Sequence, residues 1–549
     1  MNISARLTKN AKTFPDKFAI IAPKLNKQSG QYEYSSLTFK ELEIRSNRYA
    51  IALTKLGLKK GDKTLLFLKP SLDFPAMTFA LFKLGVVPVL IDPGMGKKNL
   101  LKCIEEVGPI GLIAQAEIHF LKLLYPKIFK TIKFNVTTGN MTWGKMINLK
   151  KMRNEKIQSY KEQDVVASDT AAILFTSGGT GTPKGVVYTH EIFNQQTIIL
   201  QELYQLTSND IDMPGFPLFA LFTIAMGLTS CIPDMDPTKP GRCDPRALVQ
   251  NIFDQKPTFV AGSPAIWERV ADYCNEHQIT LPSIKYLVMF GAPVSTKLHL
   301  KFKNILTTGT TYTPYGATEA LPVSNISGEF ILKNTAHLSE EGLGTCIGNA
   351  VPGIEIKIIK STDEIISHFN TQLEVQPNEI GEIIVSGKMV TAQYINQPEK
   401  TSEAKIYDEN NKFWHRMGDL GYFDSDGLLW FCGRKTHKVE AKNLTLYPIP
   451  CEAIFNKHPA VKRSALVGLG QSGNQVPAIV IERKDGQYLA GKAKSLFENE
   501  LLSIAKKYKH TKEIQKIYLS NSFPVDVRHN IKIDRLKLKE EIENNELRQ

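Results

Sequence analysis

Residues 174–185 combine four glycines, four hydroxyl side chains and one lysine in a single short stretch. Glycines let backbone N–H groups come close to an anion, and they tolerate positive φ angles. Hydroxyl groups add hydrogen-bond donors, and Lys184 adds a point charge suited to phosphate. The stretch therefore predicts a phosphate-binding loop. Its candidate ligands are Thr176, Ser177, Gly178, Gly179, Thr180, Gly181, Thr182 and Lys184.

Two common phosphate loops do not fit this stretch. A Walker loop needs Gly-Lys-Ser/Thr, whereas Lys184 lies between Pro183 and Gly185. The dinucleotide fingerprint fails as well, because Lys184 occupies the position of its third glycine. An ordinary Gly/Thr turn in a hairpin is the simpler alternative, and the composition disfavours it.

Two later stretches carry carboxylates in patterned surroundings. In residues 311–319 a tyrosine, a glycine and a threonine precede Glu319. Such a carboxylate can ligate Mg²⁺, which takes oxygen ligands from one or two carboxylates and from substrate phosphates. A lone glutamate, however, is more often a surface residue. Residues 414–434 hold two aromatic-rich runs around Ser425-Asp-Gly427, which predict a β-hairpin ending at Arg434.

Short apolar runs predict the strands that position these residues. One run at 171–175 precedes the glycine loop, and a second at 186–190 follows it. Another buried strand, at 286–290, ends on Gly291-Ala-Pro293, and open α/β sheets bind ligands at such strand ends. Strand and helix patterns alternate over 1–170, which favours a layered α/β fold with parallel sheet. Helices are predicted after the capping residue Thr38 and over 74–84, 191–204 and 265–275.

Bulk composition limits the class of protein. A chain of 549 residues is too long for one hydrophobic core, and its 42% apolar and 22% charged content is that of a soluble globular protein. The seven cysteines are scattered without a Cys-x-x-Cys pair, so neither a disulfide framework nor a zinc site is predicted, as expected in a reducing cytoplasm. The N-terminus lacks the apolar core of a signal peptide. We therefore expect a cytoplasmic location.

Two features test the expectation of a soluble protein. Residues 213–233 contain no charge, but prolines and glycines interrupt them, so a buried helix or the wall of an apolar pocket is favoured over a transmembrane segment. The net charge is +13, yet the lysines are spread along the chain without an aromatic-basic motif. Most of this charge is interpreted as solvated surface, and nucleic-acid binding is not predicted. Weak attraction to ATP or to a membrane surface stays open.

The three stretches occur in the order seen in the adenylate-forming enzymes, and the chain resembles that superfamily over nearly its whole length. The superfamily comprises acyl-CoA synthetases, luciferases and peptide-synthetase adenylation domains. The resemblance implies ATP and Mg²⁺ as cofactors, with Glu319 on the metal and Lys184 at the phosphates. It also implies that Asp419, assisted by Arg434, accepts hydrogen bonds from the ribose hydroxyls. The nucleotide-binding residues implied outside the glycine loop are Gly291, Ala292, Pro293, Tyr315, Gly316, Thr318, Asp419 and Arg434.

The same resemblance implies two domains. A large adenylation domain of several layered α/β subdomains would cover 1–434, and a small mobile α+β domain would cover 435–549, where the composition becomes richer in lysine. In the superfamily the small domain rotates and brings a catalytic lysine to the adenylation site. Lys532, in the ending Lys-Ile-Asp-Arg, matches that lysine. The alternative is a solvated surface lysine.

Four departures from the usual acyl-CoA synthetase pattern bear on the second half-reaction. Residues 436–437 replace an acidic hinge, Ala441-Lys442 replace a glycine pair, and Ala220 stands where many members have histidine. The fourth is Gly179, which stands in place of Ser or Thr. The glycine pair lets a pantetheine chain pass close to the backbone, so side chains there should narrow that passage.

With these departures the chain resembles the β-lactone synthetases of long-chain olefin biosynthesis. The resemblance implies adenylation of a 2-alkyl-3-hydroxy fatty acid with release of pyrophosphate. The 3-hydroxyl group would then displace AMP and close a β-lactone without CoA. The apolar run 216–233 would line an alkyl pocket, although a plain buried helix fits equally well.

Two other functions stay open at this point. One is a long-chain fatty acid–CoA ligase with a variant hairpin. The other is a non-catalytic or membrane-surface binding protein with a degenerate fold, against which the intact motif residues count. Partner enzymes of a lipid pathway also stay open.

Overall fold

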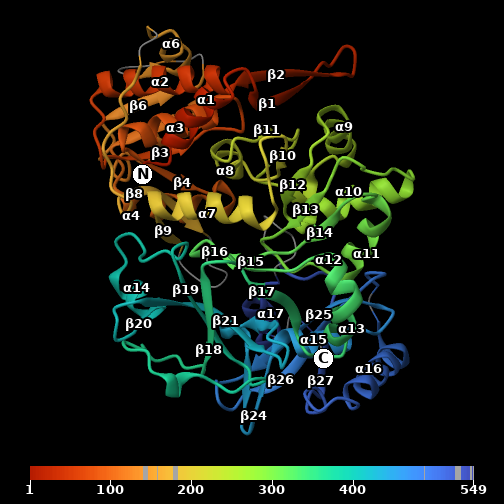
Figure 1. The fold of residues 1–549 in the computed structure, drawn as a ribbon. Coiled ribbons are helices and arrows are strands. Elements are labelled where there is room, and N and C mark those ends of the chain that lie inside the picture. Colours follow the sequence, from red (N-terminus) through yellow and green to blue (C-terminus); the bar gives the residue numbers. More distant parts are fainter. Residues whose placement is uncertain are drawn as a thin grey trace.

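A computed structural model of the chain describes residues 1–139, 142, 146–156, 159–176, 183–487, 489–525, 533–544 and 547. Two seven-stranded sheets, an eight-stranded sheet and two small C-terminal sheets form its framework (Figure 1). Helices pack around the two seven-stranded sheets, so the predicted layered α/β fold is confirmed.

The first sheet leads into the glycine loop. It is parallel except for the antiparallel pair β8–β9 at its edge. Its strands, in spatial order, are β7 (Ile147–Asn148), β6 (Phe134–Thr137), β5 (Gly111–Ala114), β3 (Lys63–Phe67), β4 (Val87–Ile91), β8 (Thr170–Thr176) and β9 (Lys184–Thr189). The helices associated with it are α2 (Phe39–Leu56), α3 (Asp73–Leu84), α4 (Lys97–Val107), α5 (Ala116–Leu124) and α6 (Leu149–Met152).

The second sheet is also parallel, apart from the antiparallel pair β1–β2. Its strands in order are β14 (Thr310–Tyr312), β13 (Tyr286–Met289), β12 (Phe259–Gly262), β10 (Ile211–Pro214), β11 (Thr229–Cys231), β1 (Phe18–Leu25) and β2 (Tyr32–Thr38). The helices in this part are α1 (Ala5–Thr13), α7 (His190–Leu203), α8 (Phe219–Ala225), α9 (Pro245–Gln255), α10 (Pro264–Glu276) and α11 (Thr296–Ile305).

The third sheet is antiparallel and collects the later motifs. Its strands in order are β15 (Tyr315–Ala317), β16 (Ala320–Asn325), β17 (Thr345–Ala350), β22 (Leu429–Arg434), β21 (Phe413–Phe423), β19 (Gly381–Gly387) and β18 (Ile354–Ile359), with β20 (Lys405–Tyr407) beside β21. Short helices α12 (Gly328–Phe330), α13 (Ala336–Glu340) and α14 (Pro398–Ala404) belong to the same stretch.

Local sequence signals explain several element ends. Thr38 and Glu41 form a capping box at the start of α2, because each side chain accepts a hydrogen bond from the other residue's backbone N–H. Gly57 ends that helix in the left-handed conformation. The predicted hairpin at residues 414–434 is confirmed as β21–β22, and the Asp424 carboxylate accepts hydrogen bonds from its turn and from the Trp430 indole.

The uncharged segment 213–233 folds into the end of β10, helix α8 and strand β11. Residues 220–225 of α8 are all buried, which confirms the expectation of a buried helix. In the part of the chain that the structure describes, no helix has the length and apolar character needed to cross a membrane.

The C-terminal region builds its own core. It contains the hairpin β23 (Val439–Ala441) and β24 (Leu444–Leu446) and the sheet of β25 (Val461–Leu469), β26 (Val476–Arg483) and β27 (Lys516–Ser520). Its helices are α15 (Pro448–Phe455), α16 (Gly491–Ala505) and α17 (Arg535–Glu543). One buried cluster consists only of residues from 439 onward. These elements, drawn in blue in Figure 1, lie at one end of the molecule beside the third sheet.

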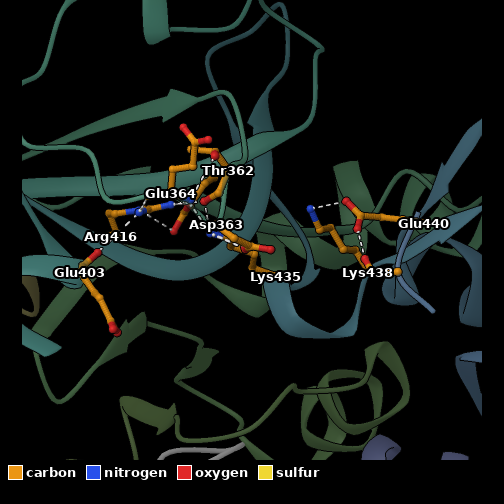
Figure 2. A network of polar contacts seen from close by, with 10 residues as sticks. Thr362, Asp363, Glu364, Glu403, Arg416, Lys435, Lys438 and Glu440 are labelled. Carbon is orange, nitrogen blue, oxygen red and sulfur yellow. Dashed lines mark hydrogen bonds and ion pairs between the residues drawn. The ribbon is translucent and has the colours of Figure 1, made fainter. Parts of the chain in front are cut away.

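A polar network anchors the segment that joins the third sheet to this region. Figure 2 shows Arg416 and Lys435 converging on oxygen atoms of residues 362–364. Both cations also contact the buried carboxylate of Glu382, at 2.6 Å from Arg416 and 3.3 Å from Lys435. Because a buried carboxylate is costly without partners, this network holds residue 435 firmly against the sheet.

Asp212 in β10 is a buried acid with an incomplete set of hydrogen bonds. Its Oδ2 accepts a hydrogen bond from Thr223, whereas its Oδ1 has no partner among the described residues. Burial raises the pKa of the Asp212 carboxyl group from 3.8 to about 7, and the Thr223 hydroxyl opposes that rise. Between these two pH values the unfolded chain has lost a proton that the folded protein still holds. Stability therefore falls as pH rises through this range.

Asp212→Asn is expected to remove this fall in stability with rising pH, because the amide side chain stays neutral. The free energy of unfolding of the variant relative to the original protein should rise from about pH 4 to pH 7 and then level off. Urea unfolding at several pH values measures the difference. Asp426→Asn, at an exposed turn, is the control. A difference that does not vary with pH would contradict the expectation.

Candidate active site

Strands β8 and β9 bring the two ends of the glycine loop together. They pair antiparallel, with Thr176 opposite Lys184. Residues 177–182 lie outside the described residues, so the predicted roles of Ser177, Gly178, Gly179, Thr180, Gly181 and Thr182 stay predictions. The Lys184 ammonium group lies 4.8 Å from the ring centroid of Tyr394, a distance suited to a cation–π contact.

Glu319 lies on the other side of the same tyrosine. Thr318 and Glu319 form the turn between β15 and β16, in which Ala317 pairs with Ala320. The Tyr394 hydroxyl donates a hydrogen bond of 2.8 Å to Glu319 Oε1. Tyr394 therefore contacts both the loop lysine, through its ring, and the predicted metal ligand, through its hydroxyl group.

The second carboxylate oxygen of Glu319 remains available. Its Oε2 accepts no hydrogen bond from another described residue, while the backbone carbonyl of Glu319 accepts from the Thr391 N–H at 2.8 Å. Among these residues, no group of three or more His, Cys, Asp or Glu side chains could enclose a metal ion. A single carboxylate suits Mg²⁺, which completes its coordination with water and substrate phosphates.

The hairpin around Glu319 is closely packed. The Tyr188 hydroxyl donates a 2.6 Å hydrogen bond to the Thr318 carbonyl. A Cβ atom on Gly316 would lie 2.6 Å from the Ala320 carbonyl oxygen, closer than real Cβ atoms approach. A glycine is therefore required at position 316. The reason for it is visible only in the structure.

The predicted ribose-binding pair is assembled across β21 and β22. Asp419 and Arg434 are register partners, and Arg434 Nη1 donates to Asp419 Oδ1 at 2.7 Å. The Asp419 carboxylate is buried, and its charge is the largest of the causes that raise the pKa of Arg434. The Tyr315 hydroxyl donates to Asp419 Oδ2 at 2.7 Å. Burial, and then the Asp419 charge, raises the pKa of Tyr315.

Gly291-Ala-Pro293 follows the carboxyl end of β13, as predicted. Gly291 adopts a φ of +88°, which favours glycine because a Cβ atom would be strained. The neighbouring Phe290 ring packs 4.9 Å from the Phe219 ring of α8. This turn thus connects the strand end to the apolar segment around α8.

A buried cation near Glu319 was missed by sequence reasoning. Lys405, in β20, is buried, and its ammonium group donates to the Thr391 carbonyl and lies 3.1 Å from His415 Nδ1. Burial lowers the pKa of Lys405 to about 7, while the Glu319 charge opposes that change. Most lysines are exposed, so a single lysine in the sequence carries no signal of this kind.

The candidate catalytic lysine, Lys532, lies outside the described residues. The residues that flank its loop are held firmly: Val525 pairs with Ile533, and Arg535 makes hydrogen bonds of 2.7 Å to both carboxylate oxygens of Glu452. His437 lies near Arg434 and Arg535. Burial, followed by the charges of Arg535 and Arg434, lowers the pKa of His437 to about 3.

A comparison with models of protein families identifies the family of this chain. The model of the family described as AMP-binding enzyme matches residues 7–395. The chain belongs to that family.

Individual relatives narrow the comparison. The chain is 39% identical over 543 residues to an olefin beta-lactone synthetase of Xanthomonas campestris pv. campestris, covering 98% of this chain and 96% of that protein. It is 37% identical over 546 residues to an olefin beta-lactone synthetase of Stenotrophomonas maltophilia, with coverage of 98% and 97%. The structure also resembles an o-succinylbenzoate coenzyme A synthetase of Bacillus subtilis in complex with ATP and magnesium. That match has a TM-score of 0.74, 21% identity and coverage of 97% and 99%.

Asp419→Asn is expected to weaken AMP binding by at least about tenfold, because hydrogen bonds to a charged group are worth roughly 1.5–3 kcal/mol. Isothermal titration with AMP measures the affinity, and a thermal melt checks that the variant is folded. Asp426→Asn on the same hairpin is the matched control, since its side chain is exposed. Unchanged AMP affinity in a folded Asp419→Asn variant would remove Asp419 from the nucleotide site.

Proposed function

We propose that this protein activates a 2-alkyl-3-hydroxy fatty acid with ATP and closes it to a β-lactone. The observation that carries the proposal is the identity of 39% and 37%, over nearly the whole chain, to two olefin beta-lactone synthetases. The arrangement of the site supports the first half of this reaction. The departures at Ala441 and Lys442, in the β23–β24 hairpin, support the second half.

In the first half-reaction a carboxylate oxygen of the fatty acid attacks the α-phosphorus of ATP. A new O–P bond forms, the bond to the pyrophosphate oxygen breaks, and acyl-AMP and pyrophosphate result. Catalysis of this kind depends on positioning and on stabilising negative charge. In the proposal, Lys184 contacts the phosphates and the Asp419–Arg434 pair holds the ribose.

Glu319 would hold Mg²⁺ through its unoccupied Oε2, and the ion would neutralise phosphate charge when bound. Tyr394 fixes the rotamer of Glu319 through Oε1, so the second oxygen keeps a constant direction. The same ring faces the Lys184 ammonium group. Tyr394 therefore sets the separation between the loop lysine and the carboxylate.

In the second half-reaction the 3-hydroxyl oxygen attacks the acyl carbon of acyl-AMP. A four-membered ring closes, the bond to AMP breaks, and the hydroxyl proton passes to water. Because this nucleophile belongs to the substrate, no external thiol has to reach the carbonyl carbon. The β23–β24 hairpin fits that requirement, since Ala441 and Lys442 place side chains where acyl-CoA synthetases have two glycines.

An apolar pocket beside α8 supports an alkyl substrate. It is lined mainly by aliphatic, aromatic and proline side chains, among them Ile20, Phe74, Pro217, Ala220 and Ile232. Ala220 is buried there, at the position where many family members carry histidine. A methyl group leaves more apolar space than an imidazole, which suits a hydrocarbon chain.

We also propose that residues 1–434 form the adenylation domain and residues 435–549 a domain that rotates to deliver Lys532. The separate core beyond residue 439 supports this division. Because Lys435 is anchored on Glu382 of the third sheet, the pivot would lie just beyond residue 435, next to this boundary. The cysteines support a cytoplasmic location, because all seven are buried free thiols.

A product assay tests the proposed reaction. With ATP, Mg²⁺ and a 2-alkyl-3-hydroxy acid we expect AMP, pyrophosphate and β-lactone in equal amounts, with or without CoA. Mass spectrometry of the lipid extract identifies the product. A CoA thioester that forms only with CoA, without lactone, would instead establish a fatty acid–CoA ligase. Absence of pyrophosphate with every fatty acid tested would favour a binding protein.

Lys532→Ala should slow acyl-AMP formation by at least about tenfold and leave ATP affinity nearly unchanged. The reason is that the proposed role of the lysine is to stabilise negative charge in the transition state. Pyrophosphate release measures the rate, and isothermal titration measures the affinity. The matched control is Lys537→Ala, an exposed lysine on α17. Equal rates of pyrophosphate release in both variants would refute the role of Lys532.

A further inference from the structure

Helix α5 presents an apolar face to solvent. Phe120, Leu123 and Leu124 are 58%, 59% and 57% exposed. Their spacing of three and four residues puts them on one side of the helix. The opposite side packs onto the core of the first sheet through Ile118 and Leu121. Within the described chain, no other helix or strand exposes three large hydrophobic side chains.

Positive charge follows this face in the chain. Lys127, Lys130 and Lys133 follow α5 in the connection to β6; all three are exposed, and none forms an ion pair with another described residue. Lys97, at the start of α4, lies 4.9 Å from the ring centroid of Tyr125, next to the end of α5. Glu117 is the one exposed acidic residue of α5 itself.

We propose that α5 and residues 125–133 bind peripherally to the surface of an anionic lipid bilayer. The apolar face formed by Phe120, Leu123 and Leu124 would enter the boundary between head groups and acyl chains. The three lysines of the connection would lie among the lipid phosphates. Unpaired lysines beside exposed leucines suit such a surface, because it offers apolar and anionic groups at adjacent depths.

A second copy of the chain fits this face poorly. Stable protein interfaces bury about 800 Å² on each partner, which is more than three side chains supply. In a symmetric pair the lysines of one copy would also approach those of the other, and the repulsion has no acidic patch on α5 to offset it. The charges therefore favour an anionic surface over self-association.

Membrane contact would serve the proposed reaction. A fatty acid with two alkyl chains partitions into bilayers, and an enzyme at the bilayer surface meets it at high local concentration. This advantage rests on the proposed function, but the binding itself does not. It can therefore be measured without any lipid substrate.

Vesicle flotation of the full chain tests the apolar contribution. We expect binding to vesicles of phosphatidylglycerol and phosphatidylcholine and at least about tenfold weaker binding to phosphatidylcholine alone. The triple variant Phe120→Ser, Leu123→Ser and Leu124→Ser should lose at least about tenfold in affinity for the mixed vesicles. The matched control changes three exposed leucines elsewhere to serine. These are Leu300, Leu496 and Leu536.

A second pair of variants tests the charge. Lys127→Gln, Lys130→Gln and Lys133→Gln together should weaken binding by at least about tenfold and abolish most of its salt dependence. The control makes the same charge change at three exposed lysines in the C-terminal region. These are Lys506, Lys507 and Lys509. All six substitutions lie at exposed positions, so the fold should persist, and a thermal melt verifies it.

A fluorescence measurement locates the contact. The emission of Leu124→Trp, compared with the unmodified chain, should shift to shorter wavelength when mixed vesicles are added. Absence of vesicle binding, or equal losses in the α5 and control variants, would overturn the proposal. A stable dimer in sedimentation velocity would also overturn it, if the α5 variant is the one variant that becomes monomeric. Pyrophosphate release with a short soluble acid should be unchanged in every variant, so a failure of membrane binding is distinguishable from a failure of the proposed function.

Discussion

The ion pair between Asp419 and Arg434 is the interaction on which the rest of the site depends. A carboxylate as deeply buried as Asp419 needs a cationic or hydrogen-bonding partner, and the register of β21 with β22 supplies Arg434 directly opposite. Tyr315 then reaches the same carboxylate from the β15–β16 hairpin. That hairpin carries Glu319 in its turn. One buried charge thus links the β21–β22 hairpin to the hairpin that carries Glu319.

The same strand also determines where the chain leaves the third sheet. Arg434 is the last residue of β22, and Lys435 immediately joins the buried network of Glu382 and Arg416. Arg434, which pairs with Asp419, is therefore adjacent to the proposed pivot. A rotation after this point would move the C-terminal region while the Asp419–Arg434 pair stays in place. Such an arrangement suits an enzyme that must keep acyl-AMP bound between two half-reactions.

The polar groups around Tyr394 and the apolar pocket beside α8 are lined by different residues. Charged and polar groups surround Tyr394, with Lys184 on its ring and Glu319 on its hydroxyl, whereas the pocket beside α8 is apolar. Under the proposed function, the phosphates and the alkyl chain of the substrate would therefore meet distinct environments. The exposed apolar face of α5 is a third region, and three exposed lysines follow it in the chain.

The sequence by itself determined the strands around the glycine loop and the β21–β22 hairpin, because glycine turns, capping residues and apolar periodicity are local properties. It also indicated the function through motif order and through the departures at residues 441–442. Only the tertiary structure decided that Lys405 is buried behind Glu319 and that Tyr394 links Lys184 to Glu319. Those contacts join residues far apart in the chain. Burial and partners are set by packing between sheets, which no local pattern encodes.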